Sequence, residues 1–251
     1  MPSFGRGFES RIVAINAEGE TIRERSFGTY GRDDYGIGVP LLASLGMGKN
    51  ERGLVAAISG GEVAALDEDF EIIWREGGFR NDFGHEFYTG DLDGDGQDEI
   101  AFCTMDHVNM GYCDGANIGE LVVLDHDGKI LLRRRVDEYY PDTHFDDIAM
   151  ADFRGVGMEI LVEKGMLLDQ NGDQVWDMSG EFDHGQWITH ATLEEGSVIF
   201  ISELWGWRGR SSLISGNGEK LMEIGELPLS SLDSREFPGW HVLPTRCHMV
   251  S

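Results

Sequence analysis

Residues 90–100, GDLDGDGQDEI, contain aspartates at alternate positions, intervening glycines, and a glutamate just before the apolar run IAFCTM. Calcium prefers six to eight oxygen ligands from carboxylates and carbonyls, and a tightly wound loop can direct alternate side chains at one centre. We therefore predict a calcium loop between two short strands. Its expected ligands are the side chains of Asp91, Asp93, Asp95 and Glu99 and the backbone carbonyl of Gln97.

The spacing in this loop differs from that of a helical EF-hand, which needs a bidentate glutamate at its twelfth position. Counted from Asp91, that position is Phe102. The alternative interpretation is a solvated acidic turn without a metal. The regular D-x-D-G-D-G spacing favours calcium.

A second pattern repeats along the chain at intervals of roughly fifty residues. In each copy an apolar residue leads into a short polar stretch, usually with an acidic residue or Asn at the fourth position and then Gly, before apolar character returns. This pattern is typical of a hairpin tip between two strands. The copies are INAEGETIRER from Ile15, LDEDFEIIWRE from Leu66, LDHDGKILLRR from Leu124, LDQNGDQVWDM from Leu168 and ISGNGEKLMEI from Ile214.

Two further apolar runs precede four of these tips, so each unit contains four short strands. Units of this kind and period are typical of an all-β β-propeller built from four-stranded antiparallel blades. A β-sandwich also has many short strands but would not repeat one tip. We expect a single domain over residues 1–251, either five-bladed or a slice of a seven- or eight-bladed propeller. The expected blades are 10–27 with 240–251, 38–78, 84–136, 144–179 and 184–228.

The loop that would bind calcium degenerates in the following unit. After DIAMADF, the turn RGVGMEI keeps Asp152 and Glu159, but Arg154 and Val156 replace the middle carboxylates. An arginine in place of a ligand excludes calcium. We therefore expect one calcium site, with a structural role in holding one turn.

Charge and cysteine content restrict the possible partners. A formal net charge of −26 argues against nucleic acid and anionic lipid surfaces. The amino terminus has no apolar signal region and no segment is long enough to span a bilayer, so either the protein is cytoplasmic or a signal lies outside this chain. With three cysteines, a Cys103–Cys113 bridge is possible, and burial of all three as small apolar residues is at least as well supported.

Four histidines precede or begin the expected innermost strands: His85, His144, His184 and His241. Because innermost strands of a propeller run in the same direction, these side chains would converge on one mouth of the channel. Imidazoles there could bind a metal or transfer protons, or each could cap its strand structurally. Tyr140 and Asp147 belong to the same expected polar rim.

The stretch ELWGWRGRSS offers a second candidate surface. Trp205 and Trp207 could present flat apolar faces to sugar rings, and Arg208 could bind a carboxylate. The alternative is a pair of tryptophans that pack between blades beside solvated arginines.

The D-x-D-G-D-G loop resembles the FG-GAP or VCBS repeat of integrin-like propellers. The wider pattern, HEFYTGDLDGDGQDEIAF followed by HFDDIAMADF and DHGQ, is similar to rhamnogalacturonan lyases of polysaccharide lyase family 11. That resemblance implies a secreted, calcium-dependent enzyme that cleaves a pectic polysaccharide by β-elimination. It would make His144 or His184 the base and Arg208 or a second calcium ion the electrophile. It would also place His85, His241, Tyr140, Trp205 and Trp207 at the substrate.

A non-catalytic, calcium-stabilised propeller that binds glycans or proteins is the competing interpretation. A polyanionic substrate would need a local positive patch or bridging calcium to approach so acidic a protein, and the chain has few clustered cations. The sequence leaves the oligomeric state open.

Overall fold

Residues 8–30, 41–48, 51–58, 61–79, 82–83, 87–105, 119–135, 147–182, 187–193, 196–202 and 211–224 are described by the computed structural model. Within these ranges the chain forms β-strands joined by turns, with one short 3-10 segment, η2, at Ser179–Glu181. None of the described helical structure is long and apolar enough to cross a membrane.

The strands form five antiparallel sheets, which we call blades 1 to 5 in chain order. Blade 1 contains β1 (Phe8–Ile15) and β2 (Thr21–Tyr30). Blade 2 contains β3 (Leu42–Gly48), β4 (Glu51–Ile58), β5 (Glu62–Leu66) and β6 (Ile72–Glu76). Blade 3 contains β7 (Asp82–Phe83), β8 (Tyr88–Gly90), β9 (Glu99–Met105), β10 (Glu120–Leu124) and β11 (Ile130–Arg135).

The remaining two blades are four-stranded meanders in which each strand pairs with the next along the chain. Blade 4 contains β12 (Ile148–Ala151), β13 (Glu159–Val162), β14 (Met166–Leu168) and β15 (Gln174–Asp177). Blade 5 contains β16 (Trp187–Leu193), β17 (Gly196–Ser202), β18 (Ser211–Ser215) and β19 (Lys220–Ile224).

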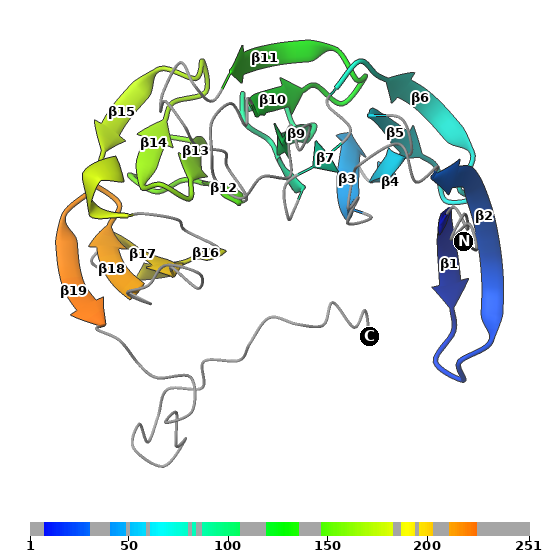
Figure 1. Ribbon diagram of the computed structural model, residues 1–251, viewed down its shortest axis with the longest axis horizontal. Helices are drawn as coiled ribbons and strands as arrows, with labels where there is room; N and C mark the ends of the chain where they lie inside the picture. The colour runs from blue at the N-terminus through cyan, green and yellow to red at the C-terminus, as the bar shows by residue number, and fades with distance from the viewer. Residues whose placement is uncertain are drawn as a thin grey trace, which may run out of the picture.

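The five blades follow one another around an arc that is open on one side (Figure 1). The first strand of each complete blade lies toward the inside of the arc, and the last strands, β6, β11, β15 and β19, lie on its outer rim with β2. This radial arrangement of four-stranded antiparallel sheets is the β-propeller architecture. The innermost strand of blade 3 differs from expectation, because it is split into β7 and β8, which both pair with β9.

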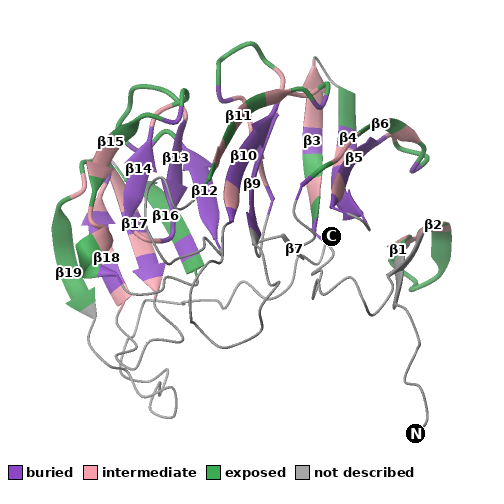
Figure 2. Cartoon of the chain, turned by 45° about the horizontal axis from the view of Figure 1, so that its top comes forward, coloured by how far each residue is buried: buried purple, intermediate pink, exposed green. Residues whose placement is uncertain are grey.

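The core lies between neighbouring blades rather than within any one sheet. The middle strands of blades 2 to 4 are largely buried on both faces, as the purple ribbons of Figure 2 show, whereas β17 and β18 of blade 5 alternate between buried and half-buried residues. The outer strands β6 and β11 alternate between exposed and half-buried residues. Between blades 2 and 3, for example, Val63 and Ala65 pack with Val122 and Leu124. Such double-sided burial requires the continuous apolar runs that the sequence has at these strands.

Four of the five hairpin tips are wound by the residue directly after the strand that leads into the tip. Asp125 Oδ1 accepts hydrogen bonds from the backbone N–H groups of Asp127, at 3.0 Å, and Lys129, at 2.7 Å. The same pair of bonds is made by the second residue of three other tips, Asn16, Asp67 and Asp169. Short polar side chains of this type stabilise turns by bonding to nearby backbone.

The outer strand of one blade reaches across the hairpin tip of the next blade. Trp74 of β6 donates from Nε1 to the carbonyl of His126, at 2.7 Å. Trp176 of β15 makes the corresponding bond to the carbonyl of Gly216, at 3.0 Å. Between blades 3 and 4 the hydrogen bond to the tip comes from Arg134 of β11, which donates to the carbonyl of Gly172, at 3.0 Å. These contacts join successive blades along the outer rim.

Candidate metal centre

The predicted calcium loop connects β8 to β9 and is wound around Asp91. Asp91 accepts a hydrogen bond from the Gly94 N–H at 2.8 Å and another from the Gly96 N–H at 3.0 Å. Both glycines have positive φ, 83° and 89°, a backbone conformation that other residues rarely adopt. The glycine positions in the sequence therefore determine the tight path of the loop.

Three carboxylates converge inside this loop. One oxygen from each of Asp91, Asp93 and Glu99 lies within 4.8 Å of the others. Asp93 is exposed, Asp91 is half-buried and Glu99 is only 1% exposed. A set of carboxylate oxygens open to solvent on one side suits a hard divalent cation such as calcium, which completes its coordination with carbonyls and water.

Asp95, another proposed ligand, bonds to the residue two positions later in the loop. The Asp95 carboxylate accepts hydrogen bonds from the Gln97 N–H, at 2.8 Å, and from Gln97 Nε2, at 3.2 Å. The three-residue cluster therefore does not include Asp95. Ligation by Asp95 and by the Gln97 carbonyl stays a prediction.

Glu99 is the most deeply buried of the three carboxylates. Its Oε2 accepts hydrogen bonds from the N–H groups of Leu92, at 2.6 Å, and Asp93, at 3.3 Å. Burial raises the pKa of Glu99 above its ordinary value, and repulsion by Asp93 and Asp95 adds to this effect, while the Leu92 hydrogen bond opposes it. A cation in the loop would offset both the burial cost and the repulsion.

Asp98, which sequence reasoning did not single out, ties the loop to blade 2. Its N–H donates to the Gly46 carbonyl at 2.9 Å, and its Oδ2 accepts from the Gly46 N–H at 2.6 Å. A Cβ at Gly46 would lie 2.7 Å from this carboxylate oxygen, so a larger residue there would displace the carboxylate from its present position. Nearby, Thr89 Oγ1 donates to the Ser44 carbonyl at 2.7 Å. The metal loop is therefore also an inter-blade contact.

In the equivalent turn of blade 4, an arginine side chain supplies the positive charge. Arg154 occupies the position of Asp93, and its Nε donates to Glu159 Oε1 at 2.6 Å. Glu159, the counterpart of Glu99, is 2% exposed, and Asp152 accepts from the N–H groups of Val156 and Gly157 much as Asp91 does in blade 3. Burial raises the pKa of Glu159, and the Arg154 hydrogen bond opposes that rise. The exclusion of calcium from this turn stays a prediction, now with a guanidinium in the ion's place.

The residues proposed for catalysis and substrate binding lie outside the described parts of the chain: His85, Tyr140, His144, His184, Trp205, Trp207, Arg208 and His241. Asp147, which we expected on the same rim, is described, and it is 2% exposed. Its carboxylate accepts the N–H of Ile188 in blade 5 at 2.8 Å and that of Ile148 at 2.9 Å. Asp147 therefore joins two blades rather than facing the channel. Cys103 is buried in the core beside β10, and Cys113 lies outside the described residues.

Comparison with known proteins supports the architecture and nothing finer. No protein-family model matches the chain, and no curated protein matches it. Among solved structures, the Vibrio cholerae biofilm matrix protein Bap1 is similar over 88% of this chain and 34% of its own, with 15% identity and a TM-score of 0.60. The Dos1 propeller is similar over 88% of this chain and 50% of its own, with 13% identity and a TM-score of 0.51.

A rhamnogalacturonan lyase of family 11 from Bacillus licheniformis also matches, over 74% of this chain and 51% of its own. Its identity of 14% and TM-score of 0.41 are too low to argue a shared activity. The chain thus has the β-propeller fold and spans about a third to a half of the lengths of these structures.

Proposed function

We propose that this chain is a calcium-binding β-propeller in which the ion stabilises blade 3 and its junction with blade 2. The observation that carries the proposal is the convergence of Asp91, Asp93 and Glu99 within 4.8 Å, with Glu99 almost fully buried. Like charges held this closely raise the free energy of the folded state unless a cation neutralises them. Calcium supplies that neutralisation through the oxygen ligands that the loop offers.

The propeller itself would act as a binding module for a glycan or a protein. Loops at one end of a rigid scaffold are where binding residues commonly lie. The formal net charge of −26 favours neutral or basic partners, or acidic partners bridged by calcium. This proposal needs no chemistry from residues outside the described parts of the chain.

Thermal unfolding tests the calcium site. Calcium at about one hundred times its dissociation constant should raise the free energy of unfolding by about 2.7 kcal/mol relative to chelated protein. Magnesium at equal ionic strength should do less, because it demands a smaller and more regular site. Glu99→Gln keeps the shape of the side chain but removes its charge, and should remove most of the calcium response.

Glu159→Gln is the matched control, because it makes the same change at the equivalent buried position, where Arg154 lies in the place of an ion. This variant should keep the full calcium response. Equal responses from the wild type, Glu99→Gln and Glu159→Gln would contradict a site at Glu99.

A polysaccharide lyase is the second candidate, and what supports it is the likeness of residues 84–215 to rhamnogalacturonan lyases. In this proposal His144 or His184 removes the proton beside a uronate carboxylate, and Arg208 or a calcium ion stabilises the charge that develops there. A secreted location belongs to the same proposal.

Ultraviolet absorbance of the unsaturated uronate product tests the lyase proposal on rhamnogalacturonan and other pectic substrates with added calcium. Absorbance should rise for the wild type and stay flat for at least one of His144→Ala and His184→Ala, which identifies the base. A flat trace for the wild type on every uronate substrate would reject the lyase and leave the binding module.

A further inference from the structure

Blade 1 has an unfinished inner edge within the described part of the chain. In blades 2 to 5 the third strand pairs with a strand on each side; β10, for instance, pairs with both β9 and β11. Its counterpart β1 pairs with β2 alone among the described strands. An open strand edge presents unpaired backbone donors and acceptors, which a further strand can satisfy.

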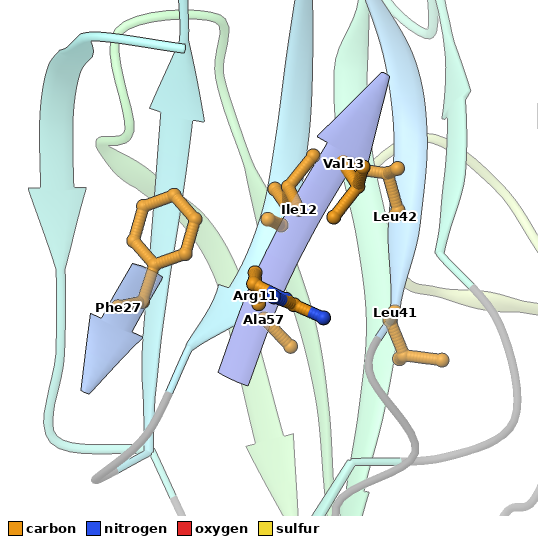
Figure 3. Close-up of a pocket in the computed structure, with 8 residues that line it drawn as sticks. Arg11, Ile12, Val13, Phe27, Leu41, Leu42 and Ala57 are labelled. Atoms are coloured by element: carbon orange, nitrogen blue, oxygen red, sulfur yellow. The ribbon is translucent and has the colours of Figure 1, made fainter. Parts of the chain in front are cut away.

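A cavity of about 360 Å³ lies beside this edge. Figure 3 shows residues of β1 and β2 on one side of it and residues of blade 2 on the other. The lining is apolar except for Arg11, and consists of Arg11, Ile12, Val13, Phe27, Leu41, Leu42, Ala56 and Ala57. Leu42, on the innermost strand of blade 2, is 50% exposed there. The cavity is thus suited to the side chains of a short apolar strand.

We propose that residues 240–243 of this same chain, Trp-His-Val-Leu, pair with the inner edge of β1 and fill the cavity. Four residues are enough for a strand of this propeller, since β12 and β13 each have four. Alternation places Trp240 and Val242 on one face and Leu243 on the other. Pro244 follows at once and ends the pairing, because proline cannot donate to a ladder.

The chain is long enough to make this connection. Fifteen residues, 225–239, separate the end of β19 from Trp240. An extended segment of that length spans about 50 Å. A compact chain of this size has a radius of gyration of about 18 Å, so the segment can reach from blade 5 to blade 1. The inference is independent of calcium binding.

Photo-crosslinking of the full chain tests the pairing. Leu42 is replaced by p-benzoyl-phenylalanine, a change at an exposed position, and the crosslinked peptides are identified by mass spectrometry. The expected product joins position 42 to residues 240–243 within one molecule. A mixture of isotopically light and heavy protein distinguishes this from a crosslink between two copies, which would overturn the proposal, as would the absence of any crosslink to residues 225–251.

Hydrogen exchange on full-length variants provides the second measurement. The triple variant Trp240→Ser, Val242→Ser and Leu243→Ser should lower protection of the β1 amides by about tenfold or more, because a paired strand edge opens before the rest of the fold. The control variant, Leu227→Ser, Leu229→Ser and Leu232→Ser, removes three apolar residues from the same segment and should leave β1 unchanged. Equal effects of the two triple variants on β1 would overturn the proposal.

Discussion

Arg154 and Asp93 occupy equivalent positions in two turns of the same design, and they have opposite charges. In blade 4 the guanidinium of Arg154 contacts buried Glu159 directly, at 2.6 Å. In blade 3 the buried Glu99 has two aspartates near it, and within the described part of the chain its carboxylate accepts hydrogen bonds from the backbone N–H groups of Leu92 and Asp93. The equivalent buried carboxylates thus differ: a side chain neutralises Glu159 in blade 4, whereas in blade 3 we propose that a calcium ion neutralises Glu99.

The pH dependence of stability should reveal the burial of Glu159. Its pKa is raised in the folded protein by burial, so the folded state binds the proton more tightly than the unfolded state does. The ionised carboxylate therefore lowers the free energy of unfolding increasingly as pH rises from the ordinary pKa through the raised one. Relative to the wild type, Glu159→Gln should become more stable as pH increases across that window. Denaturant unfolding of both proteins in a pH series measures the difference.

The surface variant Glu18→Gln provides a control for this series, because Glu18 lies exposed on the blade 1 tip. Comparison of the two series separates the effect of burial at Glu159 from that of removing an exposed carboxylate. A difference between Glu159→Gln and the wild type that does not change with pH would show that the Glu159 carboxyl group has an ordinary pKa.

Local residue patterns made part of the metal centre predictable. The spacing of Asp91, Asp93 and Glu99 and the glycines at 94 and 96 are visible in eleven consecutive residues, and the structure brings these three carboxylates together. The pairing of Asp98 with Gly46 was not predictable, because its two partners are 52 residues apart and belong to different blades.

At the scale of strands and hairpins, the tips also make packing contacts with the neighbouring blade. Gly128 has φ +83°, and a Cβ there would lie 2.7 Å from the Trp74 ring of the preceding blade. Gly19 has the same conformation, φ +82°, at the tip of blade 1, where a Cβ would meet nothing within 4 Å. Substitutions at these two positions would therefore distinguish the cost of backbone strain from the cost of disturbing the packing between blades.

Gly128→Ala should therefore destabilise the protein more than Gly19→Ala does. Both variants acquire the left-handed strain of about 1–2 kcal/mol. Only Gly128→Ala also forces the indole of Trp74 to move, which should add about 1–3 kcal/mol. Chemical denaturation measures the two differences, and equal losses would show that the Trp74 contact contributes little in solution.

The sequence also held a signal at the tips that we did not use. We emphasised the fourth residue of each repeat, but it is the second residue whose side chain winds the turn, as Asp67 and Asp169 show. That position is Asn, Asp or Ser in all five repeats. In blade 2 the expected glycine is replaced by Phe70, which adopts φ 62° and is 6% exposed.

For the whole molecule, the arc leaves one face of blade 1 uncovered. The first residue of each hairpin-tip repeat packs against the preceding blade and is fully buried at Leu66, Leu124, Leu168 and Ile214. Its counterpart in blade 1, Ile15, is 64% exposed. A further blade in that place would bury it.

Alanine substitutions test whether anything covers this face in solution. Ile15→Ala should cost less than about 1 kcal/mol, as expected for a surface position. Leu124→Ala, the same truncation between two blades, should cost about 2–5 kcal/mol. Denaturant unfolding gives both values. A loss at Ile15 comparable to that at Leu124 would mean that blade 1 is packed against another surface.

The propeller itself was predictable because every blade repeats one tip and the same apolar runs. Pairing between consecutive strands follows from short connections, as in β12 to β15. The splitting of the first strand of blade 3 into β7 and β8 was not predictable from apolar character alone. The expected convergence of His85, His144, His184 and His241 depends on segments outside the described residues and stays a prediction.

Because Asp98 bonds to Gly46, the proposed ion lies at the contact between blades 2 and 3 rather than within a single blade. The paired bonds of Asp98 to Gly46 hold the loop against blade 2, while Arg154 neutralises Glu159 within the equivalent turn of blade 4. The calcium concentration would then control the stability of one inter-blade contact, the one between blades 2 and 3. The equivalent turn of blade 4 would not respond to the calcium concentration.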